Sequence, residues 1–196
     1  MTTVSRILAS FAGCGVVLIA SLSSAGAADA SETELWQAVA SGRAVALLRH
    51  ASAPGFSDPP NFDLNDCSTQ RNLSEAGRAE AARIGDAFRA NGIEQAVVLS
   101  SQWCRALDTA RLLDLGEVTP TPALNSFFED RSSRATQTRA VQQLIQDGAG
   151  KRPRVFVTHQ VNITALSGQS SASGELIVVR PGTGVMQTLG RIAPPD

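Results

Sequence analysis

Apolar residues in this chain follow two patterns: short continuous runs, which are typical of buried strands, and longer stretches with helical spacing. The clearest helix spans residues 75–90, where Ala81, Ile84 and Phe88 fall on one face. Further helices are expected at residues 32–40, 105–115 and 139–146. Strands are expected at residues 44–49, 96–99 and 155–158, with an edge strand at 118–122 and a terminal hairpin of 176–179 and 185–189.

The order of these elements predicts the fold class. Strands that alternate with helices are typical of βαβ units, which build a mostly parallel sheet with helices on both faces. The terminal hairpin is expected to add an antiparallel edge to that sheet. Since neither an internal repeat nor a linker divides the region, we expect a single α/β domain over residues 28–196.

The first residues have the features of an export signal. Arg6 precedes an apolar stretch at residues 7–22, and Ala25-Gly26-Ala27 offers small residues to a signal peptidase. The stretch is shorter than the roughly 20 apolar residues of a spanning helix, which argues against the alternative of a retained membrane anchor. We therefore predict a signal peptide at residues 1–27 and a periplasmic or secreted protein without stable membrane insertion.

Charge and cysteine content narrow the function classes. The chain carries 17 basic and 18 acidic side chains, a balance that argues against nucleic-acid binding. Two cysteines, Cys67 and Cys104, follow the predicted signal. An exported compartment permits a disulfide between them, while two free buried thiols are the alternative.

Candidate chemistry begins with the two histidines of the chain, because each one stands at the end of a strand-like run. His50 closes the run at 44–49 and His159 closes the run at 155–158. The carboxyl ends of parallel strands meet at one edge of a sheet, so both imidazoles are expected there. A neutral imidazole is a good nucleophile toward phosphorus, and the guanidinium of the preceding Arg49 can bind phosphate oxygens.

A second arginine strengthens the prediction of a phosphate site. Arg105 stands at the start of a predicted helix, where backbone N–H groups and the helix dipole already attract anions. The alternatives are a solvated arginine beside a structural histidine, or a metal site that combines the histidines with Asp58, Asp63 and Asp66.

Four segments together resemble the histidine phosphatase superfamily, which includes phosphoglycerate mutases and acid phosphatases. The order and spacing of these segments agree with the family across nearly the whole region after the predicted signal. The segments are Arg49-His50-Ala51, Leu73-Ser74-Glu75-Ala76-Gly77-Arg78-Ala79-Glu80-Ala81, Ser101 to Ala110, and Val157-Thr158-His159.

The resemblance implies a role for each matching residue. His50 would be the nucleophile that becomes phosphorylated, Arg49 and Arg105 would bind the phosphate oxygens, and His159 would be the second histidine that contacts the phosphoryl group. The implied fold is the three-layer α/β/α sandwich of the phosphoglycerate mutases. The family uses neither a metal nor an organic cofactor.

The proton donor is less clearly marked in the sequence. The family often carries an acid in a Leu-x-Glu segment, but Leu124-Asn125-Ser126 has a serine there. Glu129 and Asp130 follow within one turn, and a general acid typically contributes about 10²–10⁴-fold to the rate. We predict Glu129 as the donor, with Asp130 as the alternative.

Modest loops separate His50, Arg105 and His159, and this favours hydrolysis over transfer. A mutase must shield its phosphorylated intermediate from water, which requires lid elements. We therefore predict a phosphatase that acts on a small phosphomonoester, such as an envelope phosphosugar. The alternatives are a phosphomutase and a non-catalytic module that binds a phosphorylated ligand. Nothing in the sequence predicts the oligomeric state.

Overall fold

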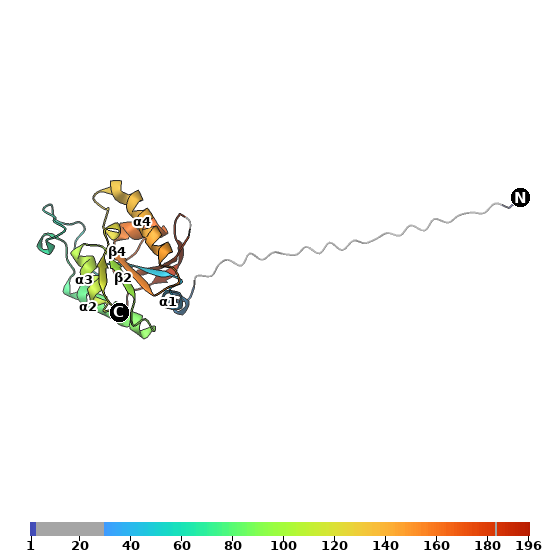
Figure 1. Cartoon of the computed structure of the whole chain (residues 1–196), viewed down its shortest axis with the longest axis horizontal. Helices are drawn as coiled ribbons and strands as arrows, with labels where there is room; N and C mark the ends of the chain where they lie inside the picture. The colour runs from blue at the N-terminus through green and yellow to red at the C-terminus, as the bar shows by residue number, and fades with distance from the viewer. Residues whose placement is uncertain (3–29, 183) are drawn as a thin grey trace.

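The computed structural model describes residues 1–2, 30–182 and 184–196, so most of the predicted signal peptide lies outside the described residues (Figure 1). The helices are α1 (Glu32–Ala40), α2 (Glu75–Ala90), α3 (Cys104–Leu112), α4 (Arg134–Asp147) and α5 (Gln160–Ser167). The strands are β1 (Val45–Arg49), β2 (Val97–Ser100), β3 (Val118–Pro120), β4 (Arg154–Thr158), β5 (Leu176–Arg180) and β6 (Gln187–Ile192). Short 3-10 turns lie at Cys67–Thr69 (η1), Pro122–Leu124 (η2) and Arg131–Ser133 (η3).

The described strands form one six-stranded sheet in the order β3-β2-β4-β1-β5-β6. Strand β4 pairs in parallel with β1 and with β2, and β3 pairs in parallel with β2 at the edge. Strands β5 and β6 are antiparallel to their neighbours. The predicted mostly parallel sheet with an antiparallel edge is therefore confirmed.

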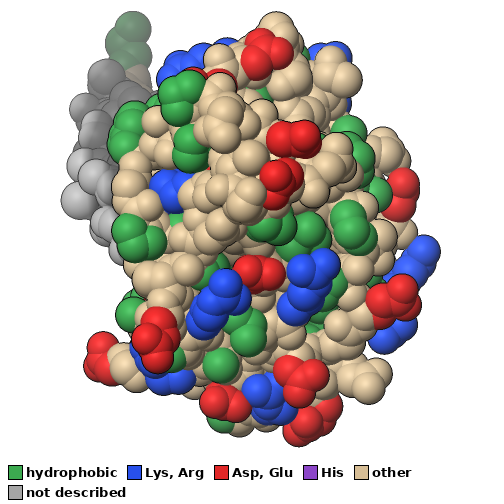
Figure 2. Space-filling model, turned by 90° about the vertical axis from the view of Figure 1, so that its left-hand side faces the viewer, with side chains coloured by type: hydrophobic (Ala, Val, Ile, Leu, Met, Phe, Trp, Pro, Cys, Tyr) green, Lys and Arg blue, Asp and Glu red, His purple; other side chains and the backbone are tan. Residues whose placement is uncertain are grey.

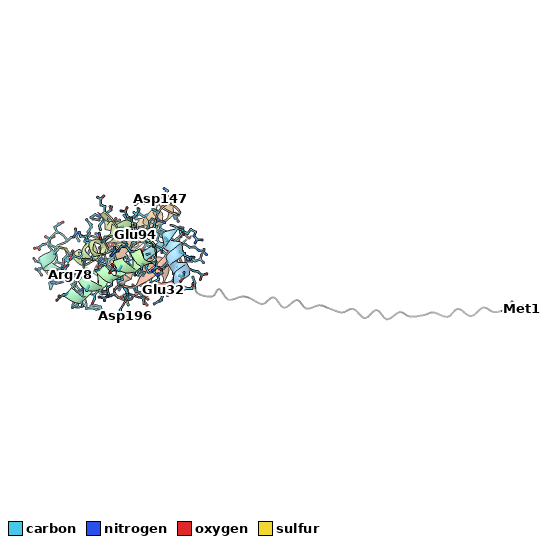
Figure 3. The ribbon with its side chains drawn as sticks, turned by 90° about the horizontal axis from the view of Figure 1, so that it is seen from below. Met1, Glu32, Arg78, Glu94, Asp147 and Asp196 are labelled. Atoms are coloured by element: carbon cyan, nitrogen blue, oxygen red, sulfur yellow. A yellow bond between two sulfur atoms is a disulfide. The ribbon has the colours of Figure 1, made fainter. Side chains whose placement is uncertain are left out.

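Helices cover both faces of the sheet, which gives the predicted three layers. One apolar cluster joins α1, α2 and α3 to alternate strand residues such as Leu48 and Val157. A second cluster joins α4 and α5 to the opposite strand face, which includes Leu47 and Phe156. Figure 1 shows α4 above the sheet with α1 and α2 below it, and the view from below in Figure 3 looks onto α1 and α2.

Helix α2 has the predicted bounds, but three other helices differ from expectation. Helix α3 ends at Leu112 rather than at 115 because Asp114 and Gly116 take positive φ angles of 51° and 125°. Helix α4 begins at Arg134 rather than at 139, since its first turns are polar and its buried stripe starts only at Val141. Helix α5 was not expected, because it has only eight residues.

Cys67 and Cys104 form a disulfide bond with each other. Cys67 lies in η1 and Cys104 opens α3, with their Cα atoms 5.7 Å apart. The disulfide ties the loop of residues 52–72 to the start of α3.

No helix in the described part of the chain is long and apolar enough to cross a membrane.

Candidate phosphate-binding site

The strand order brings the predicted site residues together at one edge of the sheet. Strand β4 lies between β1 and β2, with Arg49 opposite Thr158 and Ser100 opposite Val157. His50 follows β1, His159 follows β4, and Arg105 is the second residue of α3, which follows β2. The centroids of the two imidazole rings lie 5.4 Å apart. Residues that lie more than fifty positions apart in sequence therefore meet at a single pocket.

The hydrogen bonds of His50 define which ring nitrogen is free to react. Its Nδ1 lies 2.8 Å from the carbonyl oxygen of Ala51, so Nδ1 carries the proton and donates it. The Nε of Arg105 donates to the Nε2 of His50 across 3.3 Å, which places the lone pair on Nε2. Burial, together with the charges of Arg105, Arg71 and Arg49, lowers the pKa of His50 to about 3. The imidazole is therefore neutral at ordinary pH.

His159 is fixed by a different set of contacts. Its Nε2 lies 2.8 Å from the Oγ of Ser101, and its ring meets the Trp103 ring edge-on at 5.5 Å. Complete burial, the neighbouring His50 and the nearby Arg105 hold the pKa of His159 well below its usual value. Both imidazoles thus stay uncharged, and neither is visible on the molecular face shown in Figure 2.

The pocket carries an excess of positive charge. It has a volume of about 410 Å³, within the usual range for small-molecule sites. Five arginines and two carboxylates line it, and both imidazoles line it as well: Arg49, Arg71, Arg105, Arg131, Arg134, Asp58, Glu129, His50 and His159. The Nε atoms of Arg49 and Arg71 are buried and have no hydrogen-bond partner within the described residues. Such a site suits an anionic ligand rich in acceptor oxygens.

Arg105 is also paired with a carboxylate that belongs to the loop after β1. Its two terminal nitrogens bind both oxygens of Asp58, at 2.7 Å and 3.1 Å. The indole N–H of Trp103 and the backbone N–H of Arg71 each donate to Asp58 at 3.0 Å. Burial raises the pKa of Asp58, but these donors and the charge of Arg105 outweigh it, and the pKa lies below its usual value.

The two acids predicted as proton donors occupy different places. Glu129 lines the pocket and is exposed at its rim. Asp130 caps η3, where its side chain accepts from the backbone N–H of Ser132, and it does not line the pocket.

Within the described residues, no three His, Cys, Asp or Glu side chains are grouped so that they could hold a metal ion.

The remaining family-like segments hold the backbone that follows His50. Thr109 accepts from the Ala51 N–H at 3.0 Å, and Glu80 accepts from the Ser52 N–H at 2.8 Å. A Cβ atom at Gly77 would lie 2.0 Å from the Ser52 carbonyl oxygen, so only glycine permits this approach of α2. These residues support the nucleophile rather than contact a ligand.

Among the pocket residues that sequence reasoning missed, Arg71 and Asp58 both contact Arg105. Arg71 directly precedes the family-like segment that starts at Leu73, and this position was the available signal. The sequence indicates Asp58 only as a candidate metal ligand. Both residues lie in an irregular loop, whose path no hydrophobic periodicity predicts.

Comparison with known proteins gives a family match over part of the chain. Residues 45–128 match the model of the histidine phosphatase superfamily (branch 1). No curated protein matches the chain by sequence.

Solved structures share the fold at low sequence identity. The protein histidine phosphatase SixA complexed with tungstate matches with a TM-score of 0.57 and 17% identity, over 77% of this chain and 97% of SixA. A putative phosphohistidine phosphatase SixA from Agrobacterium tumefaciens matches with a TM-score of 0.55 and 20% identity, over 79% and 99% of the two chains. The mycobacterial glucosyl-3-phosphoglycerate phosphatase complexed with VO3 matches with a TM-score of 0.55 and 16% identity, over 74% and 96%. These solved structures share the fold of this chain, and residues 45–128 resemble the histidine phosphatase superfamily in sequence.

Proposed function

We propose that the protein hydrolyses small phosphomonoesters through a phosphohistidine formed on His50. The observation that carries the proposal is the unprotonated Nε2 of a neutral, buried imidazole, which accepts a hydrogen bond from Arg105 and lines a cationic pocket. An oxygen-rich phosphoryl group needs positioning and charge neutralisation more than covalent help, and this arrangement supplies both.

Each nearby group has a role in the proposed reaction. The Nε2 of His50 attacks phosphorus while Arg49, Arg71 and Arg105 bind the equatorial oxygens. His159, at the same edge of the sheet, donates a further hydrogen bond to the phosphoryl group. The carbonyl of Ala51 keeps the Nδ1 proton of His50 in place, so it stabilises the positive charge that develops on the ring. Water then attacks the phosphohistidine and releases inorganic phosphate.

Hydrolysis is proposed over mutase activity because side chains at the described rim of the pocket are exposed to water. Its rim includes Phe56, whose side chain is 81% exposed, and Glu129. The names of the similar structures include phosphatases for glucosyl-3-phosphoglycerate and phosphohistidine, which supports the same reaction class. The predicted signal peptide supports a periplasmic or secreted location, where an envelope phosphosugar would be a substrate.

A panel of phosphomonoesters incubated with the wild-type chain and with His50→Ala tests the proposal. We expect free phosphate from the wild type, an acid-labile phosphoryl label on His50 after a rapid quench, and neither from the variant. EDTA should leave the rate unchanged. Isomerised ester without free phosphate would indicate a mutase, and ligand binding without turnover would indicate a binding module.

A further inference from the structure

Asp58 is the pocket carboxylate that is linked to the reacting histidine through Arg105. Its side chain is 13% exposed, and it pairs with the same guanidinium that donates to the Nε2 of His50. From this arrangement we infer that Asp58, and not Glu129, delivers the proton to the leaving-group oxygen. The inference rests on the proposed function, because it assigns a residue to a step of that reaction.

The anchoring of Asp58 does not depend on Arg105 alone. When a phosphoryl group binds the terminal nitrogens of Arg105, the indole N–H of Trp103 and the backbone N–H of Arg71 still hold the Asp58 carboxylate at the pocket. Trp103 is stacked on Phe62, which lies in the same loop as Asp58, and the two ring centroids are 5.1 Å apart. Glu129, by contrast, is exposed and makes no hydrogen bond to another described residue at the pocket rim.

Substrate binding converts the ion-paired carboxylate into an acid. The charge of Arg105 keeps Asp58 ionised. A phosphate that binds Arg105 weakens this ion pair and places negative charge beside the Asp58 carboxylate. Both changes favour protonation of Asp58. The carboxylate that neutralises Arg105 in the free protein thus acquires a proton when the phosphoester arrives.

The proton can arrive with the substrate, since a phosphomonoester loses its second proton near pH 6. A bound monoanion passes its proton to Asp58. The bond from Nε2 to phosphorus then forms, the bond from phosphorus to the ester oxygen breaks, and Asp58 gives its proton to that oxygen, which leaves as the alcohol. In the second half, Asp58 takes a proton from water as the oxygen attacks phosphorus, His50 leaves neutral, and the proton returns to the phosphate product.

The dependence on the leaving group tests this role. We compare wild type, Asp58→Asn and Glu129→Gln on 4-nitrophenyl phosphate, whose phenolate leaves without a proton, and on glycerol 1-phosphate, whose alkoxide needs one. Asp58→Asn should lose about 10²–10⁴-fold in kcat on the glycerol ester and less than about tenfold on the aryl ester. Asp63→Asn, in the same loop but outside the pocket, is the matched control and should behave as wild type on both esters.

Binding of inorganic phosphate provides a second measurement that needs no turnover. Asp58 competes with phosphate for Arg105, so Asp58→Asn should bind phosphate at least as tightly as wild type. Weaker binding, or equal losses on the two esters, would show that Asp58 only orients Arg105 and would overturn the inference. A selective loss in Glu129→Gln would overturn it as well. Wild type that hydrolyses neither ester would refute the proposed function and this inference together, whereas the other failures refute the inference alone.

Discussion

The two walls of the pocket are built by different physical means. The sheet-edge wall consists of His50, His159 and Arg105, which are positioned by buried parallel strands and the helix that follows β2. The loop wall consists of Asp58 and Arg71, which lie in the irregular segment 52–72. Strand register and backbone hydrogen bonds fix the first wall, and a disulfide with a few side-chain contacts fixes the second. The difference indicates that the buried core fixes the position of the nucleophile. The charges of Asp58 and Arg71 beside it depend instead on the disulfide and a few side-chain contacts.

Arg105 belongs to the sheet-edge wall and contacts the loop wall, so its replacement should have the largest effect. In Arg105→Lys, a single ammonium replaces the planar guanidinium that donates hydrogen bonds to both His50 and Asp58. A bound phosphate then loses its bidentate partner. We expect kcat/KM for an aryl phosphate to fall by about 10²–10³-fold. Arg111→Lys, an exposed arginine of the same helix, is the control and should change little. A loss below about threefold would show that the pocket does not depend on Arg105.

Removal of the disulfide tests how far the position of the loop wall depends on this covalent link to α3. The bond closes a separation of 37 residues, and its loss in the Cys67→Ala, Cys104→Ala double variant should lower the free energy of unfolding by about 2–4 kcal/mol. Activity should fall as well, because Asp58 and Arg71 lose their fixed distance from α3. Chemical denaturation measures the stability. Unchanged activity would mean that Gln70 and Trp103 hold the loop without the disulfide.

Acid should destabilise the sheet-edge wall through its histidines. The unfolded chain protonates histidine near pH 6.5, whereas the folded pKa of His50 is about 3 and that of His159 is also well lowered. The unfolded state therefore binds more protons, and stability falls as the pH decreases from 6.5 toward 3. Between pH 6.5 and 5.5 we expect about 1 kcal/mol per histidine. His50→Asn should remove about half of this decrease, and a flat profile would contradict the burial of both rings.

The smallest effect is expected at the tip of the loop. Phe56 is 81% exposed and meets Phe128 edge-on at 5.3 Å, so little apolar surface is lost in Phe56→Ala. We expect stability to change by less than about 0.5 kcal/mol and KM to change by only about twofold to fivefold. A large loss in kcat would show that the rim takes part in the chemistry.

The boundaries of the helices show where sequence reasoning stops. Helix α2 could be predicted to the residue, because Ser74 caps its start and a continuous apolar stripe runs to Phe88. Helix α4 was predicted too short, since a polar, exposed first turn carries no hydrophobic signal. Helix α5 was missed because eight residues packed against β1 and β5 are stabilised by that packing rather than by their own periodicity.

The sequence by itself determined the alternation of strands and helices. It placed His50 and His159 where strands end, and Arg105 where a helix begins. The physical reason is that buried strands and amphipathic helices leave regular apolar patterns, and parallel strands bring their carboxyl ends to one edge. Only the tertiary structure decided that Cys67 bonds to Cys104, that Asp58 pairs with Arg105, and that Arg71 enters the pocket. These contacts join a loop without periodicity to a distant helix, and such pairings depend on the chain path rather than on local composition.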